Sequence, residues 1–74
     1  MRVTWQQDTD MAYLYLKDPI DRGEVVETVM CDDAVLRGMV SLDLDSSGRI
    51  LGIEVGPASV LLPPAVLASA RPPS

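Results

Sequence analysis

The segment "DLDSSGRILGIE" (43–54) decides how this chain folds. Asp43, Asp45, Ser47, Gly48 and Glu54 follow the ligand spacing of an EF-hand calcium loop. Such a loop needs a helix on each side, whereas both flanks here alternate apolar and polar residues with the period of two of a strand. Ligands at the first and last positions would then be cross-strand neighbours rather than a cage around an ion. The segment therefore predicts a β-hairpin with no metal site, in which Gly48 supplies the positive φ of the turn.

The same alternation continues on both sides of the hairpin and predicts a sheet. Strands are expected over 3–5, 11–17, 24–31, 35–45 and 49–55. Gly38 interrupts the fourth of these and suggests a bulge or a tight bend. Pro57 and Pro64 each suit the first turn of a short helix. We predict a mainly β (α+β) fold: a single antiparallel sheet, a meander of five strands, with a short C-terminal helical tail. The domain spans 1–70, and 71–74 form a flexible tail.

The length of the chain limits how much core it can build. At 74 residues it is a single small domain, and such domains usually need a disulfide, a metal or a partner to be stable. Cys31 is the only cysteine and there is no histidine, so an internal disulfide and a zinc site are both excluded. Hydrophobic residues make up 47% of the sequence. We therefore expect a homo-oligomer, most simply a dimer that completes the sheet.

The net charge of −5 argues against nucleic acid as a partner, because an acidic surface repels a phosphate backbone. The opening "MRVTWQQ" has no apolar signal-peptide core, and no apolar run approaches the length of a membrane span. The unpaired thiol fits a reducing compartment. The expected protein is soluble and cytoplasmic, and it does not bind membranes.

The side chains needed for the commonest enzyme mechanisms are missing. Without histidine, no Ser–His or Cys–His couple can form within the chain. Asp32 and Asp33 follow Cys31 directly and work against a nucleophilic thiolate. There is no glycine-rich phosphate loop, and we expect no cofactor. These features favour a protein that acts by binding over an enzyme.

The aromatic residues are the strongest candidates for a binding site. Trp5, Tyr13 and Tyr15 are the only aromatics, and pairing of the first two strands would place them on one side of the sheet. Interfaces concentrate binding energy in tryptophan and tyrosine. An acidic rim that selects a basic or neutral partner is predicted to consist of Glu24, Glu27, Asp43 and Glu54.

Two other interpretations of the aromatic residues stay open. The aromatics could line a pocket in which a small dimeric β-protein binds or converts an apolar small molecule, for example in a cyclase or isomerase step. They could also complete the core of a dimer or of a structural subunit in a larger complex.

Three stretches carry a resemblance to a known family. They are "MRVTWQQDTDMAYLYL" (1–16), "GEVVETV" (23–29) and "DLDSSGRILGIEVGPAS" (43–59), of which "GRILGIEV" is the most specific. In these stretches the chain resembles the small bacterial proteins of domain-of-unknown-function family twenty-two eighty-three. The resemblance implies a short antiparallel sheet followed by a small helical tail. It also implies an antitoxin-like role, because some members are suspected antitoxins, and it implies no set of catalytic residues.

Overall fold

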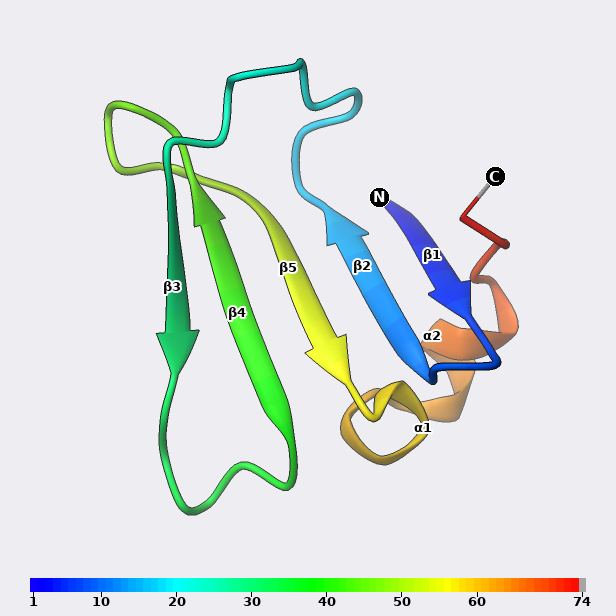
Figure 1. Ribbon diagram of the computed structural model, residues 1–74. Helices are drawn as coiled ribbons and strands as arrows, with labels where there is room; N and C mark the ends of the chain where they lie inside the picture. The colour runs from blue at the N-terminus through cyan, green and yellow to red at the C-terminus, as the bar shows by residue number, and fades with distance from the viewer. Residues whose placement is uncertain (74) are drawn as a thin grey trace.

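A five-stranded antiparallel sheet and two short helices make up the computed structural model, which describes residues 1–73 (Figure 1). This confirms the predicted fold class. The elements are β1 (Arg2–Gln6), β2 (Met11–Tyr15), β3 (Glu27–Cys31), β4 (Met39–Leu44), β5 (Ile50–Gly56), α1 (Ala58–Leu61) and α2 (Pro64–Ala68).

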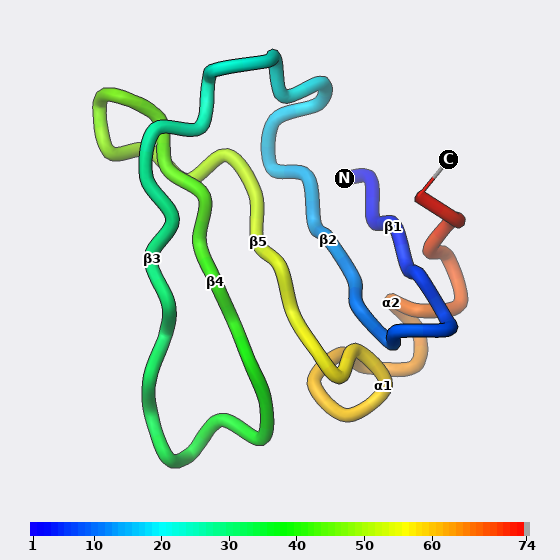
Figure 2. Tube along the Cα trace, viewed as in Figure 1, coloured from blue at the N-terminus to red at the C-terminus, as the bar shows by residue number. Residues whose placement is uncertain are grey.

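The strand order is β1-β2-β5-β4-β3, so the prediction of a simple meander is wrong in one connection. β2 pairs with β5 rather than with β3, and the chain between β2 and β3 runs along the end of the sheet (Figure 2). The physical reason lies in β5, which carries the buried Leu51 and Val55 and gains most from a central position. β3, β4 and β5 do follow one another as a meander.

The hairpin between β4 and β5 forms as predicted. The Asp45 carboxylate accepts hydrogen bonds from the main-chain N–H groups of Ser47 and Arg49, each at 2.9 Å. The bond from Arg49 is the main reason why the pKa of Asp45 lies below its usual value. Gly48 has a φ of 81°. The segment that resembles a calcium loop is thus a turn flanked by strands, and residues 1–73 hold no cluster of three or more acidic, cysteine or histidine side chains suited to a metal ion.

Two predicted strands begin later than expected. β3 starts at Glu27 rather than at 24, and β4 at Met39 rather than at 35. Gly38 marks the second boundary, because a Cβ atom there would collide with the main-chain oxygen of Gly56. The irregularity predicted at Gly38 lies instead at the other end of β4, where the register shifts between Asp43 and Leu44.

The two faces of the sheet differ in character. The helix face carries the core cluster of Ala12, Val55 and Ala58, against which α1, α2 and their linker pack Leu61, Leu62 and Leu67. The polar face carries the alternate residues. By register, they include Thr4, Tyr13, Tyr15, Thr28, Ser41, Asp43, Gly52 and Glu54.

The segment after α2 returns to the sheet. Arg71 accepts a hydrogen bond from the main-chain N–H of Trp5 and donates one to the oxygen of Val3, at 2.7 and 3.0 Å. The predicted flexible tail is therefore anchored at its first residue, while Ser74 lies outside the described residues. Within residues 1–73, neither helix is long and apolar enough to cross a membrane.

Candidate functional site

Four of the seven predicted binding residues meet on the polar face. Tyr13 and Tyr15 project from β2, and Glu54 on β5 pairs directly with Tyr13. Asp43 on β4 completes the group through a hydrogen bond with Tyr13. We call Tyr13, Tyr15, Asp43 and Glu54 the aromatic–acidic patch. Alternation within each strand and the register between the strands place these four side chains on one face.

A glycine allows Tyr13 to reach Asp43, which lies two strands away. Gly52 on β5 pairs with Tyr15 on one side and with Asp43 on the other. A Cβ atom at Gly52 would collide with the hydroxyl end of the Tyr13 ring, so the ring lies across this glycine. The Tyr13 hydroxyl donates to Asp43 Oδ2 at 2.6 Å, and Thr28 Oγ1 donates to Oδ1 at 2.7 Å. Asp43 is therefore held in place by hydroxyls from both sides.

The position of Tyr13 also determines its protonation. Partial burial, followed by the hydrogen bond to the Asp43 carboxylate, raises the pKa of Tyr13 well above its ordinary value. The phenol thus stays neutral and acts as a hydrogen-bond donor across the physiological pH range. The negative charge of the patch comes from its two carboxylates alone.

The ring of Tyr15 makes a cation–π contact with Arg2 of the same chain. The Arg2 guanidinium carbon lies 3.7 Å from the centre of the Tyr15 ring. The Asp18 carboxylate also binds this guanidinium, which donates from Nε to Oδ2 at 2.9 Å and from its second nitrogen to Oδ1 at 3.1 Å. The Tyr13 and Tyr15 rings meet edge to face with their centres 4.7 Å apart. This face of the sheet therefore accommodates a basic group on an aromatic ring beside a carboxylate.

A hollow of about 200 Å³ lies beside the two tyrosines. Its walls come from β1, β2, β5 and the C-terminal segment, and they are formed by Thr4, Gln6, Met11, Ala12, Tyr13, Tyr15, Glu54 and Pro73. Small-molecule sites usually measure about 300–1,000 Å³, so this hollow suits a single side chain better than a metabolite. The side-chain carboxylate of Glu54 has no hydrogen bond or ion pair to any other residue of the described chain.

Two larger hollows, of about 380 and 360 Å³, lie where the C-terminal segment meets β1. Their walls include Trp5, Ala70 and Pro72 in one case, and Met1, Ser69 and Arg71 in the other. Both are open grooves at the contact between the C-terminal segment and β1, and neither is lined by a residue of the aromatic–acidic patch.

The other three predicted residues lie elsewhere. Trp5 pairs with Ala12, so it lies on the helix face, and the expectation that all three aromatics share one side of the sheet is wrong. It packs against the core cluster, and its indole N–H donates to Asp10 at 2.9 Å. Glu27 also lies on the helix face, because it pairs with Leu44 on β4.

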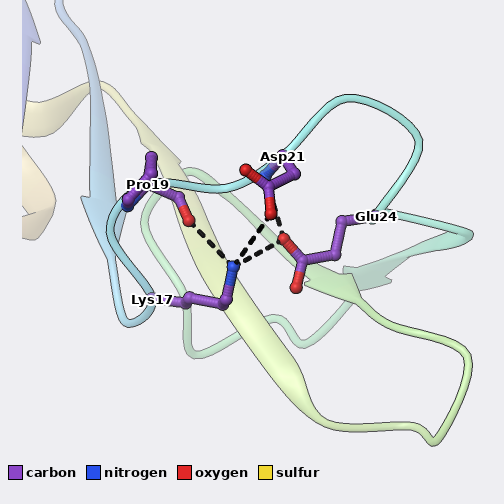
Figure 3. Close-up of polar contacts among 4 residues, drawn as sticks. All are labelled: Lys17, Pro19, Asp21 and Glu24. Atoms are coloured by element: carbon purple, nitrogen blue, oxygen red, sulfur yellow. Dashed lines mark hydrogen bonds and ion pairs between the residues drawn. The ribbon is translucent and has the colours of Figure 1, made fainter.

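The Glu24 carboxylate binds groups of the loop between β2 and β3 (Figure 3). The Lys17 ammonium lies 2.9 Å from the Glu24 carboxylate, 3.0 Å from the oxygen of Pro19 and 3.6 Å from Asp21. The main-chain N–H of Asp21 and the Lys17 ammonium together lower the pKa of Glu24. This carboxylate therefore fastens the loop and contributes nothing to a rim around the tyrosines.

Sequence reasoning missed three residues that shape the patch. Arg2 and Thr28 contact it from β1 and β3, and Gly52 makes room for Tyr13. A glycine inside an alternating strand often marks a place where another group approaches the backbone closely, and "RILGIEV" contains such a glycine at position 52. The contacts of Arg2 and Thr28 depend on strand register, which the sequence alone does not supply.

The patch offers ring faces, carboxylates and neutral hydroxyls, which are groups for recognition. Comparison with curated proteins and with solved structures finds no match. A family model does match residues 2–59, which include the whole sheet and the first residues of α1. The chain belongs to the family described as "Protein of unknown function (DUF2283)".

Proposed function

We propose that this protein is a binding module whose aromatic–acidic patch receives a basic side chain of a protein partner. The observation that carries the proposal is the free Glu54 carboxylate at the wall of a hollow lined by Tyr13 and Tyr15. A lysine or arginine placed there would gain both an ion pair and a cation–π contact. The net charge of −5 would also attract a basic partner from a distance.

The Arg2 guanidinium on Tyr15 supports this choice of ligand, because it is an internal example of the same contact. An antitoxin-like role, in which the partner is a basic toxin, is one form of such recognition and rests on the family resemblance. At the aromatic–acidic patch, the alternative of an apolar small-molecule ligand or substrate has less support, because the hollow there is small and its rim is acidic.

A peptide titration tests the proposal. Calorimetry measures binding of a short synthetic peptide of alternating lysine and glycine, with a glutamate–glycine peptide as the reference. We expect Glu54→Gln to weaken binding of the lysine peptide about fivefold, the equivalent of about 1 kcal/mol. The matched control is Asp32→Asn, which removes the same charge from an exposed position in the loop before β4. Equal weakening in both variants, or no binding by the wild type, would contradict the proposal.

A further inference from the structure

The helices leave part of the helix face uncovered. Besides the residues of the helices and their linker, the strand residues that pack against the core cluster come from β1, β2, β5 and one position of β4. Val29, Cys31, Leu42 and Leu44 lie on the same face of β3 and β4, outside that cluster. We call these four residues the apolar half-face. Val29 is 39% exposed, and none of the four is fully buried. In Figure 1 both helices lie near β5, β2 and β1, whereas β4 and β3 form the other half of the sheet.

The core of a single chain is thin. Among residues 1–73 the buried hydrophobic side chains are Val3, Ala12, Leu51, Val55 and Ala58, and no large side chain is fully buried. Two of these five residues are alanines, which contribute little apolar area. A domain of this size with so thin a core gains stability from an additional apolar contact. A second copy is the partner that is always present at a matching concentration.

The distribution of charge also favours a second copy. Two chains of net charge −5 repel each other unless they meet where charge is low. The apolar half-face carries no charged residue, and Glu27 at its corner is the one acidic side chain of β3 on that face. The acidic patch lies on the opposite face, so it would point away from the partner.

We propose that two copies pack their apolar half-faces together about a twofold axis, with the sheets stacked roughly 10 Å apart. The same four side chains of each copy form the interface, so the contact is self-complementary. This places Val29 and Leu42 in a shared core and leaves Tyr13, Tyr15 and Glu54 accessible on the outer surfaces. The proposal is independent of ligand binding by the aromatic–acidic patch.

Two substitutions on one strand test the arrangement. Val29→Glu adds a charge inside the interface, whereas Met30→Glu adds the same charge one residue further, on the polar face, where Met30 is 55% exposed. Sedimentation of the full chain over a range of concentrations gives the dimer dissociation constant. We expect Val29→Glu to raise this constant at least about tenfold and Met30→Glu to leave it unchanged. Val29→Thr, which keeps the shape of the side chain, should give a smaller increase and guards against failed folding of the first variant.

Three results would overturn the proposal. The first is a wild-type chain that stays monomeric throughout. The second is an equal effect of both glutamate substitutions, which would indicate pairing of the open β3 edges instead. The third is a dimer that is unaffected by either Val29 variant while circular dichroism shows a folded sheet.

Discussion

Tyr13 owes its position to the absence of a side chain at Gly52. The ring crosses β5 at this glycine and delivers its hydroxyl to Asp43, while Thr28 binds the other carboxylate oxygen. Four strands are thereby joined on the polar face by one ring and one carboxylate. The site and the stability of the sheet consequently depend on the same contacts.

Gly52→Ala should separate Tyr13 from Asp43. The new methyl group would displace the ring and remove a hydrogen bond to a charged acceptor, which costs about 1–2 kcal/mol at a partly exposed position. Urea unfolding measures the loss. In a Tyr13→Phe background, where that hydrogen bond is already absent, the same substitution should cost less. Equal losses in the two backgrounds would show that the cost comes from crowding of the ring and not from the lost hydrogen bond.

The raised pKa of Tyr13 makes stability depend on pH at the alkaline end. An unfolded chain releases the phenolic proton near a pKa of about 10, whereas the folded chain holds it to higher pH. The contribution of Tyr13 is therefore complete below about pH 10 and is lost as the pH rises toward the folded pKa. Urea midpoints measured across this range should fall more steeply for the wild type than for Tyr13→Phe. Parallel curves would refute the assignment.

Gly48 has a purely conformational role. Its φ is 81°, and a Cβ atom there would meet nothing within 4 Å, so a larger residue is resisted by the backbone and not by crowding. Gly48→Val should lower the free energy of unfolding by about 1–3 kcal/mol. Gly48→Asn should lose less, because asparagine tolerates the left-handed region. An unchanged thermal midpoint for the valine variant would contradict the turn assignment.

At the scale of elements, Asp10 connects the turn between β1 and β2 to the start of α1. Its main-chain oxygen accepts from Ala58 at 2.7 Å, and its carboxylate accepts from Trp5 at 2.9 Å and from both the main chain and the hydroxyl of Ser59. α1 comprises only Ala58–Leu61, so it is too short to be stable alone. The Asp10 contacts and the apolar core position it.

Asp10→Ala should loosen α1 selectively. We expect faster hydrogen exchange at Ser59 and a lower thermal midpoint, with little change in the β4–β5 hairpin. Asp8→Ala in the same turn is the control, because the Asp8 carboxylate binds only the N–H of its neighbour Thr9. The Ser59 contacts are the main reason why the pKa of Asp10 is lowered. Its stabilisation is therefore present above about pH 4 and is lost on further acidification. Similar exchange in both variants would contradict this role.

Local patterns predicted the elements better than their arrangement. Alternation identified the five strands, and Pro57 and Pro64 marked the two helix starts, because both signals are contained in adjacent residues. The pairing of β2 with β5 joins distant segments and has no local signal. The sequence does not predict which face of the sheet Trp5 occupies, because the register of β1 against β2, in which Gln6 pairs with Met11, determines that face. A shift of this register by one residue would move Trp5 to the other face.

In the candidate site too, local patterns predict some positions, whereas those that depend on the arrangement of distant segments are not predicted. Tyr13 and Tyr15 share a face by alternation within one strand, so their proximity could be predicted. The prediction that Glu24 belongs to the rim rests on its charge alone. Its capture by Lys17 depends on the path of the loop, which no periodic pattern describes. Alternation therefore predicts which side chains of one strand share a face, whereas the position of a side chain relative to other strands or within a loop depends on pairings that it does not describe.

At the scale of the whole molecule, the sheet separates two surfaces with different chemistry. We propose the apolar half-face as the contact with a second copy of the chain and the aromatic–acidic patch as the site for a basic group. Extents of 32 × 31 × 19 Å describe a thin plate, so the two surfaces lie back to back across one sheet. We infer that self-association and partner binding use opposite faces and do not compete.

Amide NMR spectra of one labelled sample test this separation most directly. The sample is first diluted and is then titrated with the lysine–glycine peptide. We expect dilution to shift the resonances of Val29, Leu42 and their neighbours, and the peptide to shift those of Tyr13, Tyr15 and Glu54. Peptide shifts centred on Val29 and Leu42, or dissociation of the dimer by the peptide, would contradict the two-surface arrangement.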